Sequence, residues 1–494
     1  MNDATPPPNS HPPGNESFPS DRSLDVAPPP GRLSIPLTLV MALLLVSGIG
    51  FFIWLQLSVP RMERVGFPER ALPHMVGRTM DLEEAIGRAP AWEQALYRLT
   101  TDNGSNDLRQ AIDWYRELAE LTYNPEIHVQ WAILEAEAGR LTDLSPRLSE
   151  WDDREEPFPM FARWLRAAYV DPRMDLGTAR ALQAEIADAL PAGWFYDKIA
   201  TKLAERSNDS ERVAALHAET DARVKPLLVK VRLMTGGELV LMLLGLPALV
   251  ILLRRRGRPY PVGAALLPPP WRGRVGVAVL IRGGALGMLL SVAFLFVEAD
   301  SPLIRLSSMP LASLPLLALA RQHLLAPHGL GFMRGFGLRI VPQGEGRLMT
   351  ATLAVLAAGL IGEWGLGVVA EWWGLSTHWT EWFDGDLVWG ETGMVVVSLL
   401  EFVVLAPLFE ELAFRGLLFG TLRRRFNWST SAAVSAGIFA IAHGYGVLGF
   451  VSVFWSGLLW AWIYEKTGSL LPSMCAHAAN NALVCLSILY FFRS

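Results

Sequence analysis

Apolar and charged segments divide the chain into unlike regions. Residues 34–57 contain no charged side chain and are long enough to cross a hydrocarbon core of roughly 30 Å. Residues 60–232 are charged and contain no apolar run of that length. Long apolar segments return over 234–492, and we expect membrane spans at 234–253, 275–298, 303–320, 348–370, 392–418, 430–446, 447–464 and 469–492. The pattern predicts an all-α protein, a polytopic membrane helical bundle of about nine spans with a soluble α-helical domain.

The N-terminal segment, residues 1–33, has nine prolines among its first thirty residues and few aliphatic side chains. Such a composition cannot bury enough apolar surface to offset the entropy lost on ordering, so we predict a disordered tail. The transmembrane segment 34–57 lies far from the N-terminus and lacks a small-x-small cleavage site. It is therefore expected to be a retained signal anchor and not a removed signal peptide.

Residues 60–232 show helical spacing of apolar positions. Between Leu108 and Arg140 apolar side chains recur every three or four residues, and Pro125 interrupts the pattern. This predicts a helical hairpin that resembles a tetratricopeptide unit and ends near Gly139. Because no repeat recurs at a fixed period, a soluble α-helical domain is preferred to a repeat array.

Composition supports a membrane protein and argues against several other classes. Hydrophobic residues make up 51% of the chain and charged residues 18%, which is below the share usual in soluble proteins. A formal net charge of −5 and the lack of a basic stripe give no reason to expect a partner made of nucleic acid. Cys475 and Cys485 would lie about 15 Å apart along a helix, too far for a disulfide, and no CxxC metal site occurs.

Arginines are concentrated in three of the loops between predicted spans. They are Arg254, Arg255, Arg256 and Arg258, then Arg321, Arg334, Arg339 and Arg347, then Arg423, Arg424 and Arg425. The positive-inside rule places these loops in the cytoplasm. The loop Glu371–Glu391 has five acidic residues, five tryptophans and no lysine or arginine, which is typical of an external loop at the lipid bilayer surface. We expect a multi-pass plasma (inner) membrane protein of a bacterium, with residues 60–232 extracytoplasmic.

A cluster of ionisable residues interrupts the span 392–418. A charge at mid-bilayer costs at least about 2.5–3.5 kcal/mol, so each one needs an explanation. Glu411 and Arg415 are four residues apart in the order that favours an ion pair. Glu410 points about 100° away from Glu411 on a helix and is free for a different role. The structural alternative is an ion pair at a span end. Three other intramembrane charges are expected only to pair or to line cavities: Arg282, Glu363 and Glu401.

Two histidines and an asparagine lie in other predicted spans. His443 ends the segment Phe439–His443, and His477 and Asn481 share one helix face. Either histidine alone could be a hydrogen-bonded core side chain. Measured from the predicted cytoplasmic ends, Glu410 and His443 lie about 20 Å deep and His477 about 12 Å deep. We expect them to meet in a cavity open to the cytoplasm, where a carboxylate, two imidazoles and an amide form a hydrolytic constellation.

Three motifs on separate spans resemble those of a known family, the type II CAAX prenyl endopeptidase and bacteriocin-processing (CPBP, or Abi) family of intramembrane proteases. They are Glu410-Glu411-x-x-x-Arg415, Phe439-x-x-x-His443 and His477-x-x-x-Asn481, with the run Gly457–Asn481 leading to the third. The resemblance covers residues 350–490, the expected protease core, and does not extend to the helical region 60–232. It implies that Glu411 and Arg415 support Glu410.

The resemblance implies that an activated water hydrolyses peptide bonds of hydrophobic, prenylated or membrane-associated substrates. Glu410 would be the general base, and His443 would orient or polarise the water. His477 and Asn481 would bind the tetrahedral oxyanion or a metal. Participation of a divalent metal such as zinc stays open, with Glu410, His443 and His477 as its candidate ligands. No HExxH motif occurs, which disfavours a zincin-type or site-2-protease mechanism.

Other functions explain fewer of these residues. A rhomboid-type serine protease needs a GxSG motif, but Phe454 stands at the first glycine position and Glu410 would be unexplained. Presenilin-type chemistry needs two intramembrane aspartates, whereas Asp384 and Asp386 fall in the external loop. The open alternative is a non-catalytic membrane scaffold, immunity protein or transporter on the same fold, since transporters also carry intramembrane Glu and His.

Residues 60–232 would recruit a protein partner or the substrate.

Overall fold

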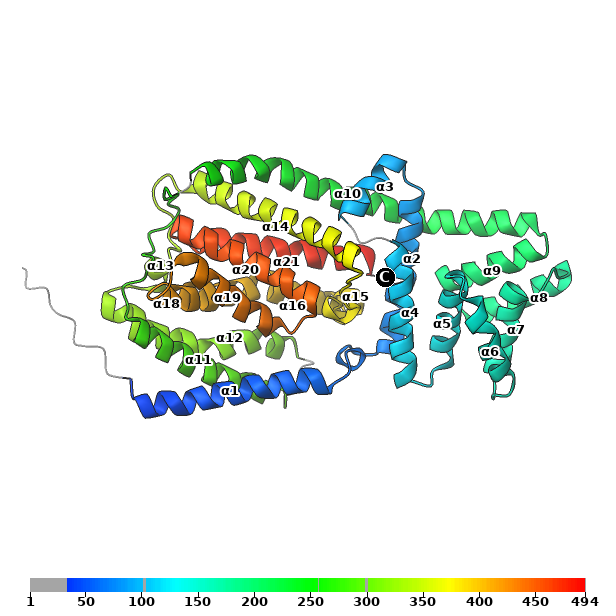
Figure 1. The fold of residues 1–494 in the computed structure, drawn as a ribbon, viewed down its shortest axis with the longest axis horizontal. Helices are drawn as coiled ribbons and strands as arrows, with labels where there is room; N and C mark the ends of the chain where they lie inside the picture. The colour runs from blue at the N-terminus through cyan, green and yellow to red at the C-terminus, as the bar shows by residue number, and fades with distance from the viewer. Residues whose placement is uncertain (1–32, 101–103, 256, 298–300, 494) are drawn as a thin grey trace, which may run out of the picture.

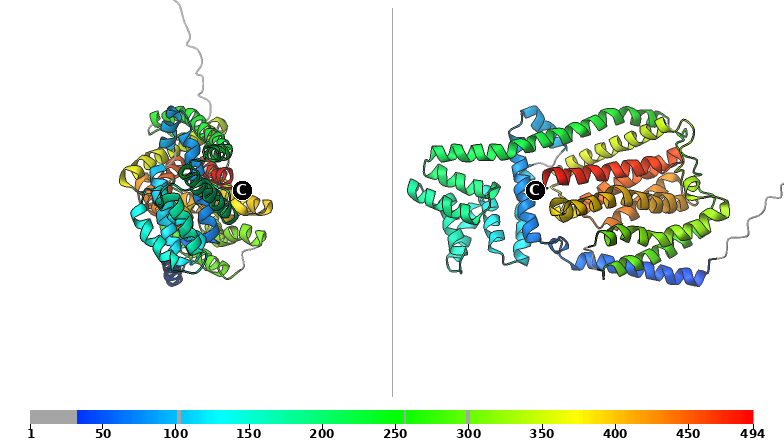
Figure 2. Two further views of the ribbon diagram at one scale, coloured as in Figure 1. Left: turned by 90° about the vertical axis from the view of Figure 1, so that its right-hand side faces the viewer. Right: turned by 180° about the vertical axis from the view of Figure 1, so that it is seen from behind.

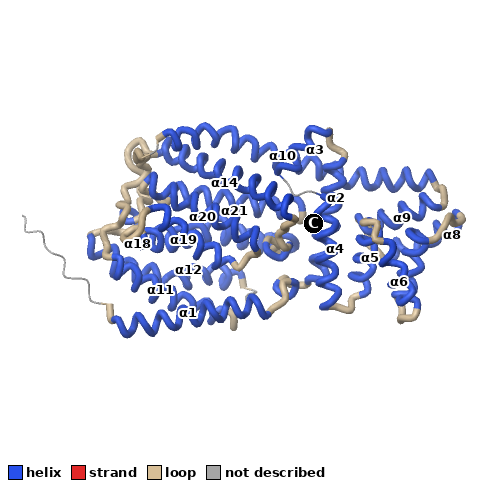
Figure 3. Tube along the Cα trace, viewed as in Figure 1, coloured by secondary structure: helices blue, strands red, loops and turns tan. Residues whose placement is uncertain are grey.

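The computed structural model describes residues 33–100, 104–255, 257–297 and 301–493. These residues form helices joined by turns and loops, and none of them is in a strand (Figure 3). Long helices lie side by side in a bundle, and shorter helices form a separate group beyond one end of it (Figure 1). The predicted all-α polytopic bundle is confirmed. The predicted tail, 1–33, lies outside the described residues except for its last residue.

Eight of the described helices are long and apolar enough to cross a membrane. They are α1 (Ile35–Ser58), α10 (Ser210–Arg254), α11 (Gly273–Phe294), α12 (Pro302–Ala320) continued by η3 (Arg321–Leu325) and η4 (Ala326–His328), α14 (Glu345–Trp373), the segment from α16 to α18 (Thr392–Leu422), α20 (Val447–Thr467) and α21 (Leu471–Phe491). Each of them overlaps one of the predicted spans over most of its length. The agreement is expected, because a chain that crosses lipid must satisfy its backbone hydrogen bonds internally, as a helix does.

One predicted span, 430–446, is not among these eight helices, because its helix is shorter than expected. It forms α19 (Trp428–His443), whose 16 residues extend about 24 Å. Asn427 caps its start by accepting a hydrogen bond from the backbone N–H of Thr430 at 2.8 Å. Gly444 ends it with a φ of 65°, a conformation that glycine adopts more easily than any other residue. The helix therefore stops at His443, short of the roughly 30 Å of a hydrocarbon core.

The helical domain, residues 60–232, consists of short helices around an aromatic core. They are η1 (Met62–Arg64), α2 (Pro68–Gly87), α3 (Ala91–Thr100), α4 (Gly104–Leu121), α5 (Pro125–Glu137), α6 (Leu141–Asp152), α7 (Phe158–Leu165), η2 (Arg166–Val170), α8 (Leu176–Ala189), α9 (Trp194–Arg206) and the first half of α10. Asn124 caps α5 and Pro125 occupies its first turn. The helices α4 and α5 pack against each other, as in the predicted hairpin. Tyr115 and Trp164 are fully buried in the core of the domain.

The helix α10 joins the helical domain to the membrane bundle and is continuous over 45 residues (Figure 1). In its first half, Arg223 contacts Asp81 Oδ2 at 2.9 Å and Asp197 Oδ2 at 2.6 Å. Its second half packs closely on α14. A Cβ atom added at Gly245 would lie 2.4 Å from the carbonyl oxygen of Leu353. One helix therefore contributes to the packing of both parts of the molecule.

The two ends of the bundle carry different loops. The arginine-rich loops after α10, before α14 (where α13, Phe332–Gly335, lies) and after α18 are at one end, and the helical domain is at the other (Figure 1, Figure 2). The loop between α14 and α16 contains η5 (Trp379–Glu381) and α15 (Gly385–Trp389). It reaches the helical domain, because Trp379 is fully buried in the core of that domain. The arginine-rich and acidic loops are thus on opposite ends, and the predicted cytoplasmic side stays a prediction.

Candidate active site in the membrane bundle

The first motif lies where the helical backbone is irregular. The segment from Thr392 to Leu422 comprises α16 (Thr392–Leu400), a π-helical turn η6 (Glu401–Leu405), α17 (Ala406–Glu410), a longer π-helical segment η7 (Glu411–Phe419) and α18 (Gly420–Leu422). π-Helical turns are rare and are frequent at functional sites. Pro407 lacks an N–H to donate to the turn before it, which fits the widened turn at η6. Glu410 and Glu411 stand at the junction of α17 and η7.

Glu411 and Arg415 form the predicted ion pair. Arg415 Nη1 lies 2.8 Å from Glu411 Oε1, and neither side chain exposes any surface. The guanidinium also lies over two aromatic rings, 4.1 Å from the ring centre of Phe439 and 4.8 Å from that of Trp460. These cation–π contacts compensate in part for the loss of water around a buried charge.

His477 lies between the two adjacent carboxylates. Its Nδ1 is 3.3 Å from Glu411 Oε1, and its Nε2 is 3.7 Å from Glu410 Oε2. The imidazole stacks on the indole of Trp460, with ring centres 4.0 Å apart and planes inclined by 20°. The Glu410 side chain keeps 25% of its surface exposed, whereas His477 keeps 3%. Of the two carboxylates, Glu410 is therefore the one that the surrounding protein leaves partly uncovered.

His443 approaches this cluster from α19. Its Nδ1 lies 2.8 Å from the carbonyl oxygen of Phe439. Because a carbonyl only accepts, this contact assigns a proton to Nδ1 and leaves Nε2 as the other functional nitrogen. The ring of Phe439 lies 4.6 Å from that of His443 and 6.1 Å from that of His477. Both imidazoles thus contact the same phenyl ring.

Asn481 has a contact that the sequence does not predict. Its Nδ2 donates a hydrogen bond of 2.9 Å to the carbonyl oxygen of Phe402, within the π-helical turn η6. A π-helical turn leaves backbone carbonyls without their usual intrahelical donors, and Asn481 supplies one. The amide therefore ties α21 to the backbone that leads to Glu410. Its expected role toward the oxyanion stays a prediction.

The expected metal ligands do not form a ligand set in this arrangement. In the part of the chain that the structure describes, no group of three or more His, Cys, Asp and Glu side chains could hold a metal ion. Glu410 Oε2 and His477 Nε2 are 3.7 Å apart, and the hydrogen bond of His443 is to the carbonyl oxygen of Phe439. Participation of a metal therefore stays a prediction.

The remaining intramembrane charges are paired, as expected. Arg282 donates hydrogen bonds to the carbonyl oxygen of Ser34 at 2.7 Å and to Thr38 Oγ1 at 3.1 Å, which anchors α1 on α11. Arg305 Nη2 lies 3.1 Å from Glu401 Oε2. Glu363 is the acceptor in a separate contact, a 2.6 Å hydrogen bond from the hydroxyl of Ser452. None of these contacts involves the three motifs.

Two residues beside the motifs are not identified by the sequence analysis. Trp460, which stacks on His477, lies in the run that precedes the third motif, but an aromatic residue in an apolar helix is too common to signal a site. Glu381 belongs to the acid-rich loop. Its Oε1 accepts a 3.0 Å hydrogen bond from the backbone N–H of Gly446, three residues after His443. No local pattern in the sequence could have indicated that contact.

Comparison with known proteins supports the resemblance. Residues 392–483 match the family model described as type II CAAX prenyl endopeptidase Rce1-like. No curated protein and no solved structure matches the chain. The matched segment runs from the start of α16 into α21 and includes all three motifs, whereas the helical domain lies outside it. Over residues 392–483, the part of the chain that holds the three motifs, the chain is therefore similar to the Rce1-like type II CAAX prenyl endopeptidase family.

Proposed function

We propose that the protein is an active intramembrane endopeptidase that uses a water activated by Glu410 to cleave prenylated, hydrophobic or membrane-associated peptides. The observation that carries the proposal is the difference in environment between two adjacent carboxylates, Glu410 and Glu411. Glu411 is fully buried and neutralised by Arg415 at 2.8 Å, whereas Glu410 is 25% exposed and pairs only loosely with His477 at 3.7 Å. A general base needs such a free lone pair within reach of water.

In the proposed reaction, Glu410 accepts a proton from the attacking water as its oxygen bonds to the scissile carbonyl carbon. The C–N bond then breaks, and the same proton passes to the departing amine. His443, whose Nδ1 is occupied by the carbonyl of Phe439, offers its Nε2 to orient that water. Glu411 and Trp460 fix the position of His477. Its Nε2 therefore needs no reorganisation to face the negative charge that develops on the carbonyl oxygen beside Glu410.

Cleavage by the purified full-length protein tests this proposal against the non-catalytic alternative. We would compare a fluorogenic peptide with a farnesylated C-terminal cysteine and a hydrophobic peptide without the prenyl group. Glu410→Gln should lower kcat by about 100-fold or more, the range for loss of a general base. Glu363→Gln alters another intramembrane carboxylate, whose hydrogen bond is to Ser452, outside the motifs; it is the matched control and should retain activity. Equal turnover by Glu410→Gln and wild type would reject the assignment.

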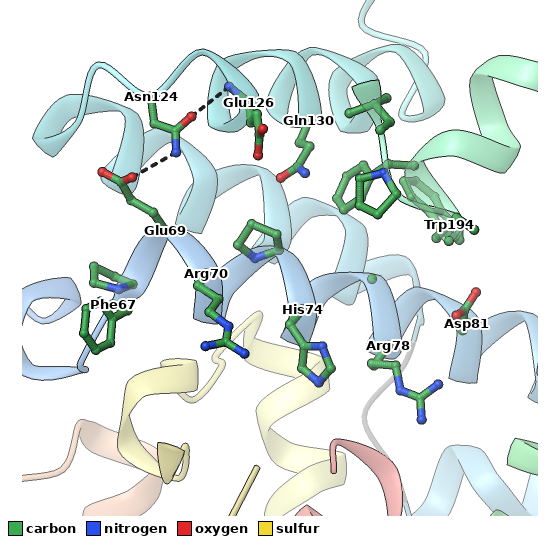
Figure 4. Close-up of a pocket in the computed structure, with 18 of the residues that line it drawn as sticks. Phe67, Glu69, Arg70, His74, Arg78, Asp81, Asn124, Glu126, Gln130 and Trp194 are labelled. Carbon is green, nitrogen blue, oxygen red and sulfur yellow. Dashed lines mark hydrogen bonds between the residues drawn. The ribbon is translucent and has the colours of Figure 1, made fainter. Parts of the chain in front are cut away.

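We further propose that the helical domain recruits the part of a substrate or protein partner that extends from the membrane. A cavity of about 990 Å³ lies along α2, bordered by the start of α5 and by the turn before α9 (Figure 4). Its lining includes the polar side chains of Asn124, Glu126 and Gln130 and the ring of Trp194. Polar groups beside an aromatic surface suit a polypeptide, whose backbone needs hydrogen bonds and whose side chains need apolar contact.

Filling this cavity tests the recruitment proposal without deleting the domain. A Cβ atom at Gly77, which lines the cavity, would meet no other atom within 4 Å, so Gly77→Trp places an indole in open space. Gly87→Trp is the control, because Gly87 is equally open but does not line the cavity. We expect only Gly77→Trp to raise KM for a full-length protein substrate, with short peptides unaffected. An unchanged KM would refute the recruitment proposal.

A further inference from the structure

The turn that follows His443 is held by side chains from two other parts of the chain. Gly446 N–H donates to Glu381 Oε1 at 3.0 Å, and a Cβ atom at Gly449 would lie 2.9 Å from Glu381 Oε2. On the other side, a Cβ atom at Gly444 would come within 2.0 Å of Gln56 Nε2, at the end of α1. The glycines therefore allow a carboxylate and an amide to pack directly on the backbone of the turn.

This turn determines where the second motif ends. His443 is the last residue of α19, and α20 begins at Val447, so only residues 444–446 separate the imidazole from the next helix. The ring of Tyr445 lies 5.5 Å from that of His443. A displacement of the turn by 1 Å would move the imidazole by a similar amount, enough to lose a catalytic alignment.

Glu381 is itself fixed by the helical domain. It is the last residue of η5, and Trp379, two residues earlier, is fully buried in the core of the helical domain. His378 Nε2 lies 3.2 Å from Glu117 Oε2 on α4. Gln110, also on α4, donates a 3.3 Å hydrogen bond to the carbonyl oxygen of Thr377. The short helix η5 thus contacts the helical domain on one side and, through Glu381, the backbone next to His443 on the other.

We propose that Glu381 is a positioning residue of the protease, and that the helical domain controls the placement of His443 through it. The inference rests on the proposed function, because it assigns a role in catalysis to the turn. It adds a second task for the helical domain besides recruitment. A change in the domain that shifts η5 would pull on Gly446 and so alter the rate of the chemical step.

Variants at Glu381 test the first part of the proposal. Glu381→Ala removes the acceptor of the Gly446 N–H, whereas Glu381→Gln retains one in the side-chain carbonyl. We expect Glu381→Ala to lower kcat about tenfold with little change in KM, and Glu381→Gln to keep most of the activity. Glu391→Ala removes an exposed acid of the same loop and should behave as wild type. Equal losses in Glu381→Ala and Glu381→Gln, or an effect on KM alone, would overturn the assignment.

Variants on α4 test the coupling to the helical domain. Glu117→Ala removes the partner of His378 at the far side of η5, and Glu120→Ala, an exposed acid on the same helix, is its control. We expect a two- to fivefold lower kcat for Glu117→Ala only. Wild-type kinetics in Glu117→Ala would overturn the coupling.

Hydrogen exchange at residues 444–446 provides a readout that does not depend on proteolysis. The Gly446 amide should exchange at least tenfold faster in Glu381→Ala than in Glu381→Gln or wild type, because its acceptor is gone. If the wild-type protein cleaves no reporter but this difference is found, the proposed function fails while the positioning contact stands. If exchange at Gly446 is the same in all three proteins, the positioning role fails whatever the activity.

Discussion

Arg415 Nη1 and Glu411 Oε1 are 2.8 Å apart in a site from which both side chains are fully excluded from solvent. Their pairing leaves Glu411 Oε2 and two guanidinium nitrogens, Nε and Nη2, without hydrogen-bond partners among the described residues. The aromatic rings of Phe439 and Trp460 face the guanidinium instead. In the proposed mechanism, this pair would hold His477 and neutralise Glu411, and Glu410 would be the carboxylate that acts as the base.

Breaking this pair should be costly, and removing it entirely should cost less. In Arg415→Met the Glu411 carboxylate stays buried without a cation, and the free energy of unfolding should fall by about 3–5 kcal/mol. The double variant Arg415→Met, Glu411→Leu should recover most of that stability, because apolar side chains often replace a buried ion pair at little cost. Both should lack proteolysis, since His477 loses its fixed environment. Equal instability of the single and double variants, measured by denaturation in detergent, would contradict this account of the pair.

His443→Ala should abolish proteolysis in a protein that still folds and inserts. The side chain donates a 2.8 Å hydrogen bond to the carbonyl oxygen of Phe439 and contacts the rings of Phe439 and Tyr445, and it forms no ion pair among the described residues, so we expect the variant to fold. Loss of a positioned imidazole in proton transfer typically lowers the rate by about 10²–10⁴. His328→Ala is a matched control, because His328 Nδ1 makes the same kind of contact, 2.7 Å from the carbonyl oxygen of Leu324, outside the site. Full turnover by His443→Ala would remove it from the mechanism.

Gly444→Ala should impair both folding and activity. A residue with a Cβ atom at φ of 65° costs about 1–2 kcal/mol, and here the Cβ would also collide with Gln56 Nε2. Adding Gln56→Ala should relieve the collision but not the backbone strain, so the double variant should recover only part of the melting temperature. Gly393→Ala, at an open position of α16, is the control. A melting temperature of Gly444→Ala equal to wild type would show that the turn is not constrained in this way.

The sequence predicts most of the bundle and the first contacts of the site because both follow from short-range rules. Span positions follow from the length of apolar runs, and the Glu411–Arg415 pair follows from a spacing of four residues on a helix. The early end of α19 does not follow from hydropathy, because apolar residues continue on both sides of Gly444, although this glycine is a recognisable helix stop.

The contacts that could not be predicted join residues far apart in the sequence. Glu381 precedes Gly446 by 65 residues and lies in a loop with no periodic pattern. The bond from Asn481 to Phe402 depends on a π-helical turn, for which no propensity rule exists. Each of these contacts depends on how helices pack, and packing is fixed by the fold as a whole and not by any single segment.

Acidification should weaken the contact between the helical domain and the C-terminal end of the membrane bundle. On α2, His74 Nε2 donates a 2.6 Å hydrogen bond to the carbonyl oxygen of Phe492, and Arg70 and Arg78 flank it on the same helix face (Figure 4). Burial lowers the pKa of His74 below its ordinary value of about 6.5, and the two arginines lower it further, although the bond to Phe492 opposes them. A lowered folded-state pKa means that stability is unaffected above pH 6.5 and falls as the pH drops below it. His74→Gln keeps a donor without titrating, so its melting temperature should fall less than that of wild type between pH 7.5 and 5.5. Identical losses in the two proteins would show that His74 does not control this interface.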